Sequence, residues 1–303
     1  MKIGTFKHVD IPVSQIVMGT LFAQELDRAA PVFDEYVVQS GNTFDTAHHY
    51  GSAESVFGEW LDANGDRSET VIITKGAHTP NCYPEAVTEQ LFESLDRLNT
   101  DFIDIYFLHR DNPDVPVGEF VDVLTEHNEA GRIRAFGGSN WSLERVDEAN
   151  AYATREGKAG FTVLSNHTSL ARMIEPPWSG CLAVSDSESK RWLNENQMPL
   201  FPWSSQARGF FVEGRSHPDD EPDPELVRCW YSDDNFERLR RVESLAKKLG
   251  VKNVTVALAY LLNQPTPTFP IVGPVNVEET RSSLAALDIE LTDAEVRWLN
   301  LED

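Results

Sequence analysis

The chain of 303 residues carries 49 acidic and 26 basic side chains, which gives a formal net charge of −23. Such a charge repels phosphate backbones and anionic membranes, so we expect no nucleic-acid or membrane partner. Its three cysteines stand far apart and outside any metal-ligand spacing, so neither a disulfide framework nor a metal site is predicted. No stretch approaches the ~20 apolar residues of a membrane span, and residues 1–10 lack the apolar run of a signal peptide, so we expect a cytoplasmic protein.

Short apolar runs rich in β-branched residues alternate with stretches of helical periodicity along nearly the whole chain. This alternation is typical of a parallel sheet built from strand–helix units. Eight strands are predicted, near residues 16–19, 43–45, 71–75, 103–109, 133–137, 162–165, 200–203 and 268–272.

Several of the intervening helices have recognisable ends. Pro84 suits a first helical turn, and an apolar stripe follows it from Val87 to Leu98. Gly131 stands where the next helix is expected to end. Thr292 and Glu295 form a capping box that predicts the start of a last helix.

Eight strand–helix units fit either a closed barrel or an open doubly wound sheet. The turn after the first strand, residues 17–21, lacks the GxGxxG pattern of dinucleotide-binding open sheets. We therefore predict an α/β fold of the TIM (β/α)8 barrel type, with residues 1–303 forming a single domain. Two irregular stretches, residues 173–189 and 213–232, are expected as long loops at the C-terminal face, functional lids rather than flexible insertions.

Four polar residues stand where predicted strands end. Asp45, Lys75 and His109 close three successive strands, and Tyr50 follows the first of them by five residues. Strand alternation places Lys75 on the side of Val71 and Ile73, and His109 on the side of Ile105 and Phe107, which are expected to fill the barrel interior. The polar side chains then lie at the barrel rim where such enzymes place their chemistry. Taken singly, each is more simply a surface or structural residue, so the ordered set carries the hypothesis.

This set suits the reduction of a carbonyl, which needs an acid that gives a proton to the oxygen. A free Tyr has a pKa near ~10, and a cation such as Lys75 favours the phenolate and lowers that pKa. Asp45 supplies the counter-ion that a buried Lys needs. His109 would orient the carbonyl oxygen beside Tyr50.

The chain resembles the aldo-keto reductase family from about Gly19 to its last predicted helix. Six motifs spread over this span carry the resemblance: residues 44–54, 73–75, 101–110, 137–141, 201–209 and 270–273. The resemblance implies a barrel that binds NAD(P)H across its C-terminal face, with Asp45, Tyr50, Lys75 and His109 as the catalytic residues.

The resemblance also implies a set of cofactor contacts. Ser139 and Asn140 would hold the nicotinamide carboxamide, and Trp203 would stack on the ring where relatives usually have Tyr. Ser204 and Arg208 would approach the pyrophosphate. The further cofactor-binding residues implied in the same way are Gly19, Thr20, Gln206 and Gly273.

Two departures from the family pattern concern the cofactor. Where many relatives have a Gln after the sixth strand, this chain has Ser165, and either Ser165 or Asn166 would take over the carboxamide contact. Where many have an Arg for the 2′-phosphate of NADPH, it has Glu279, which would repel a phosphate, although Arg281 stands two residues on. NADPH is the expected cofactor, with NADH as the alternative.

The expected substrate is a small carbonyl compound, and a sugar-like one is one hypothesis. The residues expected to face it are Leu21, Phe22, His49, Arg110 and Trp141, with residues 176–178 as a lid. For His49 and Arg110 the simpler interpretation is surface solvation, and for Trp141 it is packing under the barrel rim.

Several alternatives stay open at the level of the sequence. A nicotinamide-binding regulatory subunit of the same fold would keep the same residues, and a lyase or isomerase would use Lys75 as a Schiff base. The acid excess is interpreted as a solvated surface, with adaptation to high salt as the alternative. The oligomeric state and the physiological direction are not specified.

Overall fold

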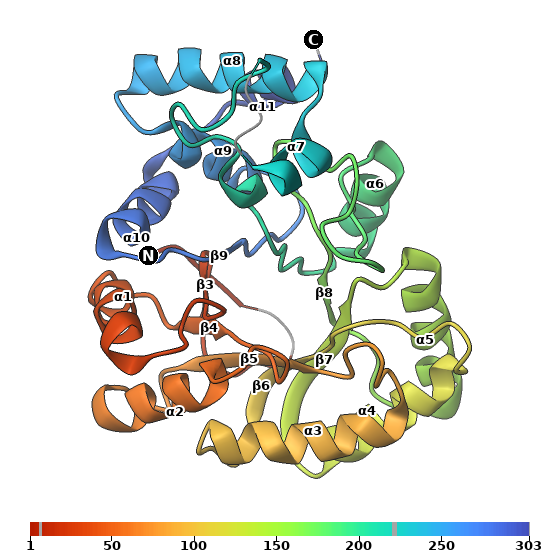
Figure 1. Cartoon of the computed structure of the whole chain (residues 1–303). Coiled ribbons are helices and arrows are strands. Elements are labelled where there is room, and N and C mark those ends of the chain that lie inside the picture. Colours follow the sequence, from red (N-terminus) through yellow and green to blue (C-terminus); the bar gives the residue numbers. More distant parts are fainter. Residues whose placement is uncertain (6–7, 220–222, 303) are drawn as a thin grey trace.

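A ring of parallel strands forms the centre of the protein (Figure 1). The computed structural model describes residues 1–5, 8–219 and 223–302. Within these ranges the hydrogen-bonded strand order is β8-β7-β6-β5-β4-β3-β9. The strands are β3 (Val17–Gly19), β4 (Thr43–Asp45), β5 (Val71–Gly76), β6 (Ile103–Leu108), β7 (Ile133–Ser139), β8 (Val163–Ser165) and β9 (Ile271–Val272). The predicted barrel is confirmed.

The predicted strand over residues 200–203 is reduced to a single bridging residue. Leu200 forms parallel bridges with Leu164 on one side and Thr268 on the other, which closes the ring between β8 and β9. Pro199 and Pro202 flank it, and prolines cannot donate to a strand ladder. The barrel therefore has eight positions around its ring, but the segment at Leu200 has too few amide donors to form a regular strand.

Helices cover the outside of the ring (Figure 1). Eight of them follow its staves in order: α1 (Leu26–Val38), α2 (Ala53–Asn64), α3 (Pro84–Arg97), α4 (Val117–Glu129), α5 (Leu143–Glu156), α6 (Ser187–Asn196), α9 (Asn253–Leu262) and α10 (Val277–Leu284). Three more, α7 (Pro224–Trp230), α8 (Asp233–Leu249) and α11 (Asp293–Leu299), contribute to a second apolar cluster with Phe210 and Phe211. No helix among the described residues is long and apolar enough to cross a membrane.

The predicted helix ends agree with the structure. Pro84 is the first residue of α3, Gly131 follows α4 with φ of 74°, and Thr292 and Glu295 form a complete capping box on α11. Both predicted irregular stretches also contain helix, since Asp186 caps α6 and Asp223 caps α7 with their carboxylates. Residues 220–222 of the second stretch lie outside the described residues.

The barrel interior is an apolar core. It contains the four predicted residues Val71, Ile73, Ile105 and Phe107, joined by Val17 from β3. A short antiparallel hairpin of β1 (Ile3–Gly4) and β2 (Val13–Ser14) adds further apolar side chains to this core. The sequence did not predict this hairpin, because its strands are two residues long.

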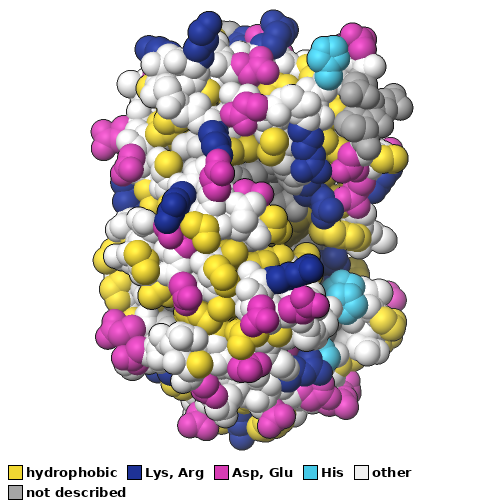
Figure 2. Space-filling model, turned by 60° about the vertical axis from the view of Figure 1, so that its left-hand side comes forward, with side chains coloured by type: hydrophobic (Ala, Val, Ile, Leu, Met, Phe, Trp, Pro, Cys, Tyr) yellow, Lys and Arg dark blue, Asp and Glu magenta, His cyan; other side chains and the backbone are white. Residues whose placement is uncertain are grey.

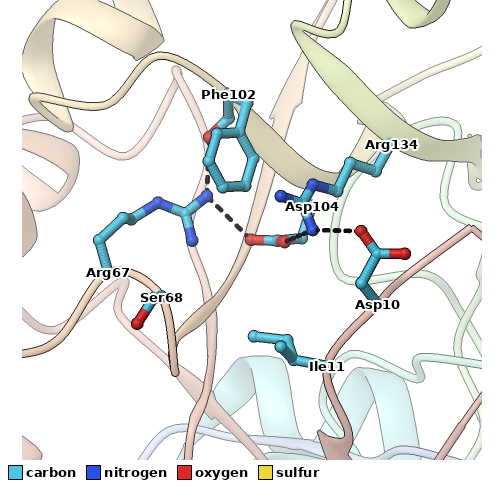
Figure 3. Close-up of a pocket in the computed structure, with 7 residues that line it drawn as sticks. All are labelled: Asp10, Ile11, Arg67, Ser68, Phe102, Asp104 and Arg134. Carbon is cyan, nitrogen blue, oxygen red and sulfur yellow. Dashed lines mark hydrogen bonds and ion pairs between the residues drawn. The ribbon is translucent and has the colours of Figure 1, made fainter.

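The N-terminal end of the barrel carries a structural ion-pair cluster (Figure 3). Arg67 donates to the buried Asp104 carboxylate at 2.9 Å, and Arg134 lies 3.8 Å from the same carboxylate and 3.0 Å from Asp10. Both guanidiniums lie against the Phe102 ring, at 4.0 and 4.1 Å from its centroid. Asp104 also accepts a hydrogen bond from the Ile72 amide. The cluster ties neighbouring strands together at the end opposite to the strand-end polar residues.

Candidate active site

A buried ion pair lies at the C-terminal ends of β4 and β5. Lys75 Nζ is 2.5 Å from Asp45 Oδ1 and donates a second hydrogen bond to the Thr46 carbonyl at 2.9 Å. The two residues are only 2% and 3% exposed. Their strands are adjacent and parallel, so residues at the ends of both reach the same rim.

Tyr50 and His109 complete the group that the sequence predicted. The Tyr50 ring centroid lies 5.3 Å from Lys75 Nζ and 5.7 Å from the centroid of the His109 ring. Tyr50 is half-buried in the turn before α2, where its amide bonds the Ala47 carbonyl. His109 directly follows β6 and is buried. The structure therefore brings all four side chains to one place.

The charges of this group oppose the effects of burial. Burial pulls the pKa of Lys75 down, but the neighbouring Asp45 and Tyr50 outweigh burial and hold that pKa above its ordinary value. Burial raises the pKa of the Tyr50 hydroxyl, and Lys75 opposes this without reversing it. The direction differs from the lowering that the sequence suggested, because burial was not visible there.

His109 is held in its neutral form. Burial, followed by the charge of Lys75, keeps the pKa of His109 well below its ordinary value. Its Nδ1 atom has no hydrogen-bond partner among the described residues. A neutral imidazole has one N–H donor and one acceptor nitrogen, which suits hydrogen bonding to an uncharged oxygen.

Two further imidazoles lie beside His109. His49 and His78 stack with their ring planes 2° apart and their centroids at 4.1 Å, and His78 lies 4.8 Å from His109. Sequence reasoning missed His78, although it follows Lys75 by three residues at the end of the same strand. Among the described residues, no group of three or more His, Cys, Asp or Glu side chains has the geometry to hold a metal ion.

The residues expected at the carboxamide form one connected set. Ser139 Oγ donates to the Ser165 carbonyl at 2.9 Å, and Asn140 Nδ2 donates to Ser139 Oγ at 3.1 Å. The Asn140 side-chain oxygen accepts from the Leu182 amide, which ties the loop after β8 to the rim. Asn166 is hydrogen-bonded to the backbone of Trp141 in both directions.

Trp203 presents its indole ring at the rim, and the turn after it contains residues with left-handed backbone conformations. Trp203 is half-buried, its Nε1 has no partner among the described residues, and the Trp178 ring lies 6.0 Å away. Ser204, Ala207 and Arg208 have φ of 48°, 48° and 51°, a conformation that is uncommon outside glycine. Such successive turns form concave arrays of amides that bind anions, and strained backbone concentrates at binding sites.

The remaining predicted cofactor residues lie around this rim. Thr20 is buried and its hydroxyl has no partner in the described part of the chain. Gly19 is packed against β9, Gly273 is exposed, and Gln206 Nε2 lies 3.5 Å from Ser283 Oγ. Arg208 is paired with Glu225 at 2.8 Å, with its guanidinium 5.2 Å from the centroid of the Trp178 ring.

Glu279 and Arg281 are both engaged on α10. The Glu279 carboxylate accepts hydrogen bonds from the Val275 amide and from Asn276 Nδ2, each at 2.9 Å, so it stabilises the turn before the helix, whose N-cap is Asn276. Arg281 forms a bidentate pair with Glu35 of α1 at 2.9 and 2.8 Å. Arg281 is thus paired with Glu35 in this structure, and its contact with a 2′-phosphate stays a prediction.

Of the residues expected at the substrate, some lie beside His109 or are exposed at the rim, and the others pack against aromatic rings. His49 and Arg110 lie beside His109, and Leu21 is 53% exposed beyond β3. Phe22 packs on Phe33 with ring centroids 5.8 Å apart. Trp141 is fully buried between the Phe120 and Phe161 rings, which agrees with packing under the rim.

The protein is a parallel (β/α) barrel, and its polar group lies at the C-terminal ends of the strands. This is where barrel enzymes place their active sites. The chain matches the model of the Aldo/keto reductase family over residues 15–300, so it belongs to that family. Members of the family are oxidoreductases that use a nicotinamide cofactor.

Three relatives illustrate the range of the family near this chain. Aldo-keto reductase str7 of Strobilurus tenacellus is 30% identical over 85% of this chain and 76% of its own length. Aldo-keto reductase yakc of Schizosaccharomyces pombe, named for NADP(+), is 27% identical over 82% and 74%. An aryl-alcohol dehydrogenase of Phanerodontia chrysosporium, also named for NADP(+), is 25% identical over 94% and 77%.

Proposed function

We propose that this protein interconverts a small aldehyde or ketone and the corresponding alcohol, with NADPH as cofactor and NADH as the alternative, and with Tyr50 as the proton donor. The main support is the buried Lys75–Asp45 ion pair, with an N–O distance of 2.5 Å. The Tyr50 ring centroid lies 5.3 Å from the Lys75 ammonium. This arrangement gives one hydroxyl a fixed cation and a neutral imidazole as neighbours.

Each of the four residues has a distinct task in the proposal. Tyr50 gives its proton to the substrate oxygen, and Lys75 stabilises the phenolate that is left behind. Asp45 keeps Lys75 charged in a buried place. Neutral His109 orients the oxygen by hydrogen bonding. Because Lys75 is held as an ammonium, it is a poor nucleophile, which argues against the Schiff-base alternative.

The residues present fit a nicotinamide cofactor. The unpartnered Thr20 hydroxyl, the half-buried Trp203 ring and the turned amides from Ser204 to Arg208 offer a hydrogen bond, a stacking surface and an anion site along one rim. When bound in its reduced form, the nicotinamide supplies a hydride to the carbonyl carbon. Relatives named for NADP(+) favour NADPH, whereas Glu279 favours NADH.

Replacing Tyr50 by Phe tests the assigned proton donor. We expect the turnover of an aldehyde panel that includes aromatic aldehydes and sugars to fall at least ~100-fold, because general acids contribute roughly 10²–10⁴. Cofactor affinity, measured by tryptophan fluorescence, should stay nearly intact. The panel also tests the sugar-like substrate hypothesis.

Tyr152→Phe is the matched control, since Tyr152 is a partly exposed residue of α5 that bonds Asp122. This variant should turn over substrate as the unmodified protein does. Retained turnover in Tyr50→Phe would contradict the assignment of the proton donor.

A further inference from the structure

Arg110 is a buried cation, and both of its hydrogen-bond partners among the described residues are uncharged. It directly follows His109 and is only 7% exposed. One Nη donates to the His109 carbonyl at 2.9 Å, and the other lies 3.4 Å from the Cys181 sulfur. Within the described part of the chain, Arg110 has no carboxylate within ion-pair distance.

The carboxylates near Arg110 are committed to other cations. Asp111 forms a bidentate pair with Arg145, both distances being 3.0 Å. Asp45 is paired with Lys75. A buried charge without a counter-ion is costly, so a guanidinium kept in this state is poised for an anion from outside the chain.

Arg110 lies next to the candidate active site, since it directly follows His109 and donates a hydrogen bond to the His109 carbonyl. Burial is the main cause that lowers the pKa of His109 and of His78, and the Arg110 charge adds to the lowering in both. The same charge acts on the Tyr50 hydroxyl, where it opposes the effect of burial. Arg110 directly follows His109, whose ring centroid lies 5.7 Å from that of Tyr50, so Arg110 and the proposed proton donor belong to the same part of the rim.

We propose that Arg110 is a specificity-determining residue that binds an anionic oxygen group of the substrate, so that the protein prefers carbonyl compounds carrying a carboxylate or a phosphate. This inference rests on the proposed function and names the substrate class of the same site. The planar fork of a guanidinium matches two oxygens of one such group. The imidazoles of His49 and His78 add donors beside it.

The surroundings agree with this substrate class. The protein carries a net charge of −23, so a buried, unneutralised cation next to the proposed proton donor gives the site a sign opposite to that of the whole molecule. A local positive field in a closed place concentrates anionic substrates. The exposed Trp178 and Leu182 on the loop above Arg110 offer apolar contacts to the rest of the substrate.

The test compares charged and neutral aldehydes of matched shape. We would measure kcat/KM for 4-formylbenzoate and for its neutral methyl ester with the unmodified protein and with Arg110→Gln. The ratio of acid to ester should fall by ~30-fold in Arg110→Gln, mostly through KM, and Arg110→Lys should restore part of it. An equal loss for acid and ester would overturn the proposal, since it would indicate a merely structural role.

Two further arms identify the anion. Succinic semialdehyde and glyceraldehyde 3-phosphate distinguish a carboxylate from a phosphate, and the preferred one should lose most in Arg110→Gln. Arg228→Gln is the matched control, because Arg228 donates to the Pro176 carbonyl of the same loop and is paired with Glu175. It should leave the ratio unchanged, and a shift as large as that of Arg110→Gln would refute the assignment.

A binding measurement separates this inference from the proposed function. Benzoate and benzamide would be titrated against tryptophan fluorescence without any turnover. Arg110-dependent binding of benzoate over benzamide supports the anion site even if no carbonyl compound is reduced, in which case the proposed function alone fails. Equal affinity for the two probes would overturn the anion site while leaving the proposed function standing.

Discussion

The ionisation of Tyr50 is set by opposing influences, of which burial is the largest and the charge of Lys75 the next. Burial raises the pKa of the hydroxyl, and Lys75 lowers it without fully compensating. The hydroxyl therefore stays protonated throughout the neutral range, which is the form that a proton donor needs. In the proposed reaction, Lys75 would act mainly on the phenolate that remains after Tyr50 has given up its proton.

This balance predicts how the reduction of a carbonyl depends on pH. A donor with a raised pKa loses its proton only as the pH rises through a value above its ordinary ~10. The value of kcat for reduction should therefore be flat from pH 7 to 9. A decline with an apparent pKa below 9, seen in a stopped-flow or steady-state pH profile, would show that Lys75 dominates over burial.

The charge of Glu279 on α10 is expected to influence the preference between the two nicotinamide cofactors. Glu279→Gln keeps a side-chain oxygen for the Val275 amide but removes a negative charge. One charge at short range in water is worth roughly 1 kcal/mol, so the affinity for NADPH relative to NADH should rise about fivefold in fluorescence titrations. Glu278→Gln, which removes a charge paired with Lys252, is the control and should change the ratio less.

At the level of single residues, strand endings were the informative signal. Asp45, Lys75 and His109 were predictable because parallel strands bring their ends to one rim, and the structure places them there. The stacking of His78 on His49 was not predictable, because it depends on how two loops approach each other. The missing counter-ion of Arg110 likewise depends on which partner Asp111 takes.

The pairing of β7 with β8 depends on a glycine at the point of closest approach. A Cβ atom added at Gly137 would lie 1.8 Å from the Val163 carbonyl oxygen, which is backbone and has no freedom to move aside. Gly137 and Val163 are paired in the sheet. The backbones of the two strands approach closely at this position.

Gly137→Ala should therefore destabilise the protein by at least ~2 kcal/mol, the scale of overpacking in a core. The measurement is the free energy of unfolding from denaturant titration. Gly131→Ala is the control, because Gly131 has φ of 74° and open space around it, so the loss there should be about 1 kcal/mol. Equal losses in both variants would refute the steric explanation.

At the level of elements, apolar runs correctly predicted the positions of seven strands. The eighth predicted strand is not regular, because its prolines lack amide donors. Residues 200–203 have the composition of a strand, but the flanking prolines leave only Leu200 as a bridge. The interior face was predictable from alternation alone, as Val71, Ile73, Ile105 and Phe107 show. The hairpin of β1 and β2 lacked any run long enough to detect.

At the scale of the whole molecule, acidic side chains are spread over the face shown in Figure 2 and interspersed with basic ones. With a net charge of −23, like charges repel at low ionic strength. We expect the melting temperature to rise between 10 and 150 mM KCl, as the screening length shortens from ~30 to ~8 Å. A plateau above that concentration fits an ordinary solvated surface, and a continued rise into molar salt fits adaptation to high salt.

The class of fold was predictable from the alternation of strand and helix patterns, and the absence of a GxGxxG turn selected the barrel. The single domain over residues 1–303 and the cytoplasmic location stay predictions from the sequence. The second apolar cluster around α7, α8 and α11 was not predicted, since helical periodicity does not say which neighbour a helix packs against.

The segment at Leu200 that closes the ring between β8 and β9, here called the seam, affects local unfolding. Prolines at 199, 202, 267 and 270 remove amide donors on both sides of it, whereas β5 and β6 are paired over four residues of each strand. Opening the ring should therefore need the least free energy between β8 and β9. Amide hydrogen exchange should be fastest there, and a nicotinamide stacked on Trp203, at the edge of the seam, should slow it.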